Sequence, residues 1–234
     1  MNLRLEKVVP WGRSLQEYQA MFGLTDTDLQ RRILDCGGGP ASFNAEMHQL
    51  GHTVISCDPI YQFSAADIHQ RVVESAPAVL QGVQATQQNF VWRQIRSPEH
   101  LIEIRLTAMR QFLADFPTGL EQGRYLNIAL PHLPFADQAF DLALCSHLLF
   151  TYSDQLSLEF HLAAIQEMLR VASEVRLFPL LVNMTGEISP HLATIWQHFQ
   201  DADCQVTIET VSYEFQRGGN QLLKIIALEK NHRA

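Results

Sequence analysis

Three consecutive glycines follow a short apolar segment in the sequence ILDCGGGPASF. Because Gly37, Gly38 and Gly39 have no side chains, backbone amides there can approach a ligand closely, and a helix beginning after them would present its positive dipole end. Asp58 ends the next strand-like segment, HTVISCD, 21 residues after Gly37. At this spacing a carboxylate at the tip of the neighbouring strand can accept hydrogen bonds from both hydroxyls of a ribose. The pattern predicts a binding site for an adenosine-type ligand.

Two classes of ligand compete for this site. A dinucleotide fingerprint requires G-x-G-x-x-G/A after the strand, and this chain has Gly37, Gly39 and then Ser42. Asp35, just ahead of the glycines, would repel a pyrophosphate but suits a ligand with a positive charge, such as S-adenosylmethionine. The sequence therefore fits an NAD-dependent oxidoreductase less well than a protein that binds S-adenosylmethionine.

Elements that alternate along the chain must position these residues. Strand-like and helix-like patterns follow one another through most of the sequence, which favours an α/β fold around a mainly parallel sheet. Gly218 and Gly219 join the last two strand candidates, so we expect an antiparallel hairpin to finish the sheet. Strands are predicted over residues 31–36, 52–58, 124–128, 140–145, 174–182, 205–211 and 222–228, and helices over 158–169, over 190–199 and from Phe43 through Met47 and Leu50 to a stop at Gly51.

Residues 59–123 interrupt this alternation, because 65 residues separate Asp58 from Arg124 and a crossover needs only about a dozen. Ser97 and Pro98 predict an N-cap and a first helical position. One apolar stripe follows, made of Ile102, Leu106, Met109, Leu113 and Phe116. In the Gln-rich stretch 68–95 we expect Pro77 and Gly82 to interrupt a helix.

We predict that this insert forms two or three helices and that residues about 62–116 cap the ligand cleft and supply most acceptor specificity. A fixed buttress is the alternative. Hydrogen exchange with and without S-adenosylhomocysteine distinguishes the two, because a lid gains protection when the ligand binds.

The segments DCGGGPA and LPFADQAFDLALCSH resemble two signatures of the class I S-adenosylmethionine-dependent methyltransferases. The resemblance covers most of the chain outside residues 1–30 and 59–123. It implies a Rossmann-like, doubly wound, seven-stranded sheet with an antiparallel C-terminal strand, and S-adenosyl-L-methionine as the cofactor. By this resemblance Asp35 holds the methionine amino group, Gly37, Gly38 and Gly39 line the methionine part, and Asp58 binds the ribose.

The same resemblance places the adenine beside the turn that begins at Leu133. Ala129 stands where the family usually has an acidic residue, so backbone groups of residues 130–133 would read the adenine. An N-terminal helix beginning near Ser14 would close over the cleft, with Arg13 or Tyr18 touching the methionine carboxylate. A surface arginine and a core tyrosine are the alternative for these two.

Methyl transfer is an in-line displacement, so the protein mainly aligns donor and acceptor and removes a proton where one must leave. No metal is required. The acceptor is expected over the end of strand 140–145, beside Cys145, Ser146, His147, Phe150 and Tyr152. His147 is the candidate general base, with a hydrogen-bonded structural histidine as the alternative. A nucleophilic role for Cys145 is rejected because no basic residue flanks it.

Composition narrows the class of protein further. The 234 residues carry a net charge of -8, and only three of the 17 basic residues are Lys, without a basic run, so no nucleic-acid partner is expected. No segment reaches the ~18–20 apolar residues of a membrane span, and the N-terminus lacks a signal-like apolar region. The four Cys residues are far apart, which favours reduced thiols in the cytoplasm.

We therefore expect residues 1–234 to form one cytoplasmic methyltransferase-like domain, with an N-terminal helical segment over 1–30 and a cap over 59–123. The predicted function is methyl transfer to a small-molecule acceptor. A non-catalytic or regulatory S-adenosylmethionine-binding protein is the main alternative, favoured by Ala129 and by the lack of an evident catalytic acid or base. The acceptor and the oligomeric state stay open.

Overall fold

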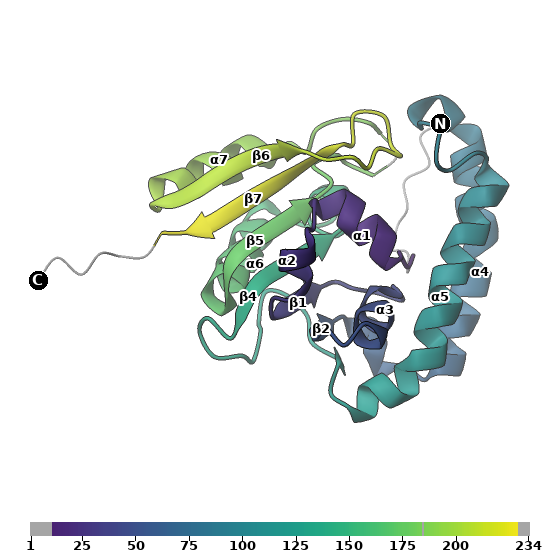
Figure 1. The fold of residues 1–234 in the computed structure, drawn as a ribbon. Helices are drawn as coiled ribbons and strands as arrows, with labels where there is room; N and C mark the ends of the chain where they lie inside the picture. Colours follow the sequence, from purple (N-terminus) through teal and green to yellow (C-terminus); the bar gives the residue numbers. More distant parts are fainter. Residues whose placement is uncertain (1–10, 184, 229–234) are drawn as a thin grey trace, which may run out of the picture.

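One seven-stranded sheet runs through the middle of the molecule, and helices cover both of its faces (Figure 1). The computed structural model describes residues 11–183 and 185–228, so the first ten residues of the predicted 1–30 segment lie outside the described part. The strands are β1 (Ile33–Cys36), β2 (Val54–Cys57), β3 (Tyr125–Leu126), β4 (Phe140–Ser146), β5 (Ala172–Phe178), β6 (Cys204–Thr210) and β7 (Gln221–Ala227).

The strand order is β3-β2-β1-β4-β5-β7-β6. Neighbours from β3 to β5 pair in parallel, whereas β7 is antiparallel to both β5 and β6. This confirms the predicted mostly parallel sheet with an antiparallel C-terminal strand. The central strands β1 and β4 are buried almost throughout, as expected for parallel strands covered on two sides. Strand β3 has two residues where five were predicted.

The helices form two layers around the sheet. Helices α1 and α3 pack on one face with Ile33, Val54 and Leu142, and α6 and α7 pack on the other with Leu34 and Ala143. The helices are α1 (Leu15–Phe22), α2 (Asp26–Leu29), α3 (Phe43–Gln49), α4 (Ala65–Ala85), α5 (Pro98–Glu121), α6 (Leu158–Val171) and α7 (Leu192–Asp201), with short 3-10 turns η1 (Pro59–Gln62), η2 (Gln87–Asn89) and η3 (Phe150–Tyr152). No helix within the described ranges is long and apolar enough to cross a membrane.

The stretch between β2 and β3 holds two long helices, α4 and α5, which lie side by side along the edge of the domain (Figure 1). Helix α5 also contacts α3, so the pair is attached to the layer that covers one face of the sheet. Ser97 caps α5 as predicted, because its hydroxyl accepts a hydrogen bond from the His100 amide at 3.1 Å.

The structure differs from three details of the predicted helices. Helix α4 continues through Pro77 and Gly82, because Pro77 is exposed and water can bind the carbonyl that loses its helical donor. Of the predicted stripe of α5, Leu106, Met109, Leu113 and Phe116 pack in one hydrophobic cluster, but the buried side of the helix is wider and also includes Leu101, Arg105, Ala108 and Phe112. Leu50 is exposed because α3 ends before it.

Candidate functional site

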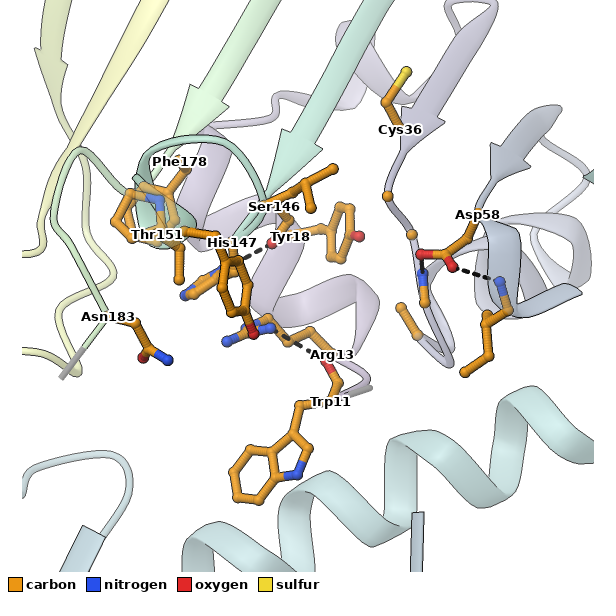
Figure 2. A pocket seen from close by; sticks show the side chains of 18 of the residues that line it. Trp11, Arg13, Tyr18, Cys36, Asp58, Ser146, His147, Thr151, Phe178 and Asn183 are labelled. Atoms are coloured by element: carbon orange, nitrogen blue, oxygen red, sulfur yellow. Dashed lines mark hydrogen bonds between the residues drawn. The ribbon is translucent and has the colours of Figure 1, made fainter. Parts of the chain in front are cut away.

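A cavity of about 490 Å³ opens at the carboxyl ends of β1, β2 and β4 (Figure 2). Ligands bind at this edge of open α/β sheets, where the strand order reverses on either side of the first strand. The cavity extends from the glycine loop (residues 37–39) and Asp58 to the loops after β4 and β5.

The glycine loop has the backbone that only glycine adopts easily. Gly37 and Gly39 have φ values of 69° and 55°, in the left-handed region. The Gly37 amide donates to the Cys57 carbonyl at 2.8 Å, which fixes the loop to the end of β2. A side chain on Gly38 would overlap the carboxylate of Asp35 beneath it. The loop therefore fits closely between β1, β2 and the cavity.

Asp58 follows β2 and lines the cavity. One carboxylate oxygen accepts from the Gly39 amide at 3.0 Å, and the other accepts from the Ile60 amide at 2.8 Å (Figure 2). Burial raises the pKa of Asp58 above its usual value, while these two amides act in the opposite direction. Each oxygen keeps a second lone pair, so this carboxylate can still accept hydrogen bonds from a ligand diol.

Asp35 does not reach the cavity surface, in contrast to the role that the resemblance implied. Its side chain lies under the glycine loop, where Tyr18 donates to Oδ1 at 3.0 Å and Ser56 donates to Oδ2 at 3.1 Å. Burial raises the pKa of this carboxyl to about 7. Because successive side chains of a strand point to opposite faces, Asp35 points toward helix α1, which covers it. Asp35 therefore lies beneath the cavity lining, and its contact with a ligand's amino group stays a prediction.

The segment before α1 contributes Arg13, and the helix itself contributes Tyr18; both line the cavity. Tyr18 stacks on Phe43, with ring centroids 4.1 Å apart. The Ser42 amide donates to the Arg13 carbonyl at 3.0 Å, which joins this segment to the start of α3. The Arg13 guanidinium donates through Nη1 to the Trp11 carbonyl at 3.2 Å.

The end of β4 presents Ser146 and His147 to the cavity. His147 has a φ of 51°, an uncommon value for a residue other than glycine. Its amide donates to the Phe178 carbonyl at 2.7 Å, and its Nδ1 lies 2.9 Å from the Ser146 hydroxyl. Burial, with the nearby charges of Arg13 and Arg105, holds the pKa of His147 well below its usual value. The imidazole is therefore neutral at pH 7.

The remaining predicted residues divide between the cavity and the core. Leu133 lines the cavity together with Ala129 and Leu130, but its amide donates to Glu167 at 2.9 Å and is not free to bind adenine. Tyr152 also lines the cavity. Cys145 and Phe150 are buried in the core instead. Burial raises the pKa of the Cys145 thiol to about 12, which agrees with the rejection of a thiolate nucleophile.

The stretch between β2 and β3 provides one wall of the cavity. Besides Asp58, its contribution consists of Pro59, Ile60, Gln62, Phe63, Arg71, Val79, Val83, Phe90 and Leu101. Sequence reasoning missed a second group of lining residues, namely Trp11, Thr151, Phe178, Pro179, Asn183, Tyr213, Phe215 and Gln216. The signals that point to this group are weak: Phe178 ends β5 and Pro179 follows it, and Tyr213, Phe215 and Gln216 belong to the connection between β6 and β7.

The strand order, with β7 antiparallel, defines the class I methyltransferase fold, and the glycine loop and Asp58 occupy its ligand-binding edge. No family model matches the chain. The chain is 31% identical over 224 residues to the uncharacterized protein MJ0045 of Methanocaldococcus jannaschii. The aligned region covers 95% of this chain and 98% of that protein. The chain therefore belongs to the same family as that protein.

Solved methyltransferase structures show weaker similarity. Magnesium protoporphyrin IX methyltransferase from Synechocystis PCC 6803 is 13% identical, with a TM-score of 0.48 over 92% of this chain and 81% of that chain. A putative S-adenosyl-L-methionine-dependent methyltransferase from Methanococcus maripaludis is also 13% identical, with a TM-score of 0.46 over 94% of this chain and 85% of that chain. At these values the similarities do not indicate a substrate.

Proposed function

We propose that this protein is an S-adenosylmethionine-dependent methyltransferase that acts on a small molecule. One observation carries the proposal: on a sheet with the class I methyltransferase strand order, the glycine loop and the Asp58 carboxylate line the same cavity at the carboxyl ends of β1 and β2. This is the arrangement that an adenosine-type ligand needs.

The donor set of the cavity fits S-adenosylmethionine. Asp58 can accept the ribose hydroxyls with the lone pairs that the Gly39 and Ile60 amides leave free. The left-handed glycines give close backbone access to the methionine part, and the turn at residues 129–133 borders the adenine end. When bound, this molecule supplies a methyl group on a sulfonium, which any aligned nucleophile can attack.

Ser146, His147 and Tyr152 border the place where an acceptor would meet that methyl group. His147 can accept a proton because it is neutral, but its lowered pKa makes it a weak base. The site therefore favours an acceptor atom that reacts without losing a strongly held proton. Walls from several elements and a net charge of -8 favour a small molecule over a nucleic acid.

The depressed pKa of His147 is also the observation that favours the alternative, a protein that binds S-adenosylmethionine without turnover. Incubation with methyl-tritiated S-adenosylmethionine and a metabolite panel separates the two. The proposal expects S-adenosylhomocysteine and a labelled product to form in equal amounts. Tight binding of the donor with no product from any panel member would favour the binding protein.

A further inference from the structure

Two arginines lie near each other beside the cavity, but only one of them has a carboxylate partner among the described residues. Both Glu17 carboxylate oxygens lie 2.6 Å from Nη1 of Arg105, and Tyr213 lies 3.2 Å from Nη2. Arg105 is about 1% exposed, so this ion pair is complete and buried. Its positive charge is neutralised within the protein.

Among residues 11–183 and 185–228, no carboxylate forms an ion pair with Arg13. Its Nη1 donates to the Trp11 carbonyl, a neutral group, and its Nε is buried without a hydrogen-bond partner in the described chain. Burial lowers the pKa of Arg13, and the charge of Arg105 adds to the effect. Arg13 is half-buried and its guanidinium lines the cavity, so a charge that is partly withdrawn from water there favours a ligand that brings a counter-charge. The site therefore carries a surplus positive charge that an anion would satisfy.

Arg13 lies on the side of the cavity away from Asp58. Figure 2 shows its guanidinium below His147, between that ring and Trp11, with Asp58 across the view. The charged and phenolic groups that influence it are Arg105, Tyr213, Glu17 and Tyr18. Among the described lining residues Asp58 is the only carboxylate, so no negative side chain of this wall would repel an anion near Arg13.

The wall next to Arg13 is aromatic and apolar. Phe90 stacks on Phe215 with ring centroids 4.7 Å apart and an angle of 19°. The Val91 amide donates to the Phe215 carbonyl at 2.7 Å, so the loop after α4 and the segment before β7 are fixed to each other. Trp11 packs against the same cluster. Such a preformed surface suits a flat, apolar molecule.

We propose that the methyl acceptor is a small aromatic carboxylate, whose carboxylate pairs with Arg13 and whose ring lies against Trp11, Phe90 and Phe215. This inference rests on the proposed function and specifies its acceptor. A monoanion matches the one charge of Arg13, because the other arginine among the described lining residues, Arg71, is stacked on the Phe63 ring with its Cζ 3.9 Å from the ring centroid. The methionine carboxylate of the donor is the competing source of the same anionic group.

The test measures binding of matched pairs by calorimetry, with the protein saturated with S-adenosylhomocysteine. The probes are benzoate and benzamide, anthranilate and anthranilamide, and indole-3-acetate and indole-3-acetamide. In at least one pair the acid should bind about tenfold more tightly than the amide. Arg13→Gln should remove this preference, while Arg93→Gln, which removes an exposed arginine outside the cavity, should keep it.

A second experiment, on binding of the methyl donor's product, distinguishes a carboxylate of the acceptor from the methionine carboxylate of the donor. Our proposal expects Arg13→Gln to leave the Kd of S-adenosylhomocysteine within about twofold of wild type. If the variant weakens S-adenosylhomocysteine about tenfold but not 5′-methylthioadenosine, which lacks the amino-acid part, Arg13 belongs to the donor and the proposal is wrong.

Equal binding of acid and amide in every pair, or no binding of either, would also overturn it. These comparisons use the wild-type protein and hold even if the Arg13 variant does not fold. Failure of wild type to bind S-adenosylhomocysteine at all would instead reject the proposed function, and this inference with it.

Discussion

The acidic type of Asp35 helped to predict the class of ligand, but the position of its side chain in the fold could not be predicted from the sequence. The sequence places an acidic residue before the glycines, but the alternation of strand side chains turns it toward α1, where Tyr18 and Ser56 hold it. Arg13 shows the converse: its position before a helix was evident, whereas its missing counter-charge depends on which groups the fold brings around it.

The raised pKa of Asp35 predicts a pH-dependent stability. Because the pKa is about 7 in the folded protein and about 3.9 in an unfolded chain, the folded state keeps a proton that the unfolded state releases, and this contribution to stability is lost as pH rises from about 4 to 7. Asp35→Asn keeps a neutral, similarly shaped group. Its free energy of unfolding relative to wild type should therefore increase with pH, by on the order of a few kcal/mol.

Urea unfolding of both proteins between pH 4.5 and 8 measures this difference. Two parallel stability curves would show that Asp35 ionises normally in the folded protein. The difference between the two proteins is the relevant quantity, because groups on which the Asp35 charge has no effect, such as His147, contribute equally to both.

At the scale of elements, the ion pair between Glu17 and Arg105 connects α1 to α5. Replacing Arg105 with Met leaves a buried carboxylate without its partner and should lower the free energy of unfolding by about 3–5 kcal/mol. The double variant Glu17→Leu with Arg105→Met should recover much of this loss, because both charges of the pair are removed together. Arg110→Met, on the exposed side of the same helix, should change stability by less than about 0.5 kcal/mol. If the loss of unfolding free energy in the double variant equals the sum of the losses in the two single variants, Glu17 and Arg105 are not energetically coupled.

The same ion pair refines the expected behaviour of the cap. Because Arg105 ties α5 to α1, we expect amides of residues 101–116 to be equally protected from hydrogen exchange with and without S-adenosylhomocysteine. A gain of protection on ligand binding should be confined to residues 79–95, which line the cavity through Val79, Val83 and Phe90. If residues 101–116 also gain protection, α5 opens with the lid and the ion pair does not anchor it.

The ends of helices could be predicted from the sequence where neighbouring residues alone determine them. The Ser97 cap and the Pro98 start of α5 follow from capping chemistry alone. The buried side of that helix did not follow, because α5 contacts both α3 and α4 and a single apolar stripe describes only one partner. Pro77 was predicted to interrupt a helix, but α4 continues through it, because its exposure to water depends on tertiary packing that the local sequence does not give.

For the whole molecule, the order of strands and helices predicted the sheet and its closing hairpin. The half of the cavity that we propose for the methyl donor was also predictable, because Gly37, Gly39 and Asp58 follow consecutive strands at a characteristic spacing. The aromatic wall was not, since Trp11, Phe90 and Phe215 come from three segments far apart in the sequence. Only the folded chain brings them to one surface.

Calorimetric titration with S-adenosylhomocysteine, on wild type and Asp58→Ala, tests the central claim most directly. We predict one site per chain in wild type and a binding free energy about 2–3 kcal/mol weaker in the variant, because two ligand hydroxyls lose a charged acceptor. Asp67→Ala, which removes an exposed carboxylate outside the cavity, should bind as wild type does. No binding by wild type, an unchanged Kd in Asp58→Ala, or preferential binding of NAD would contradict the assignment of this cavity to S-adenosylmethionine.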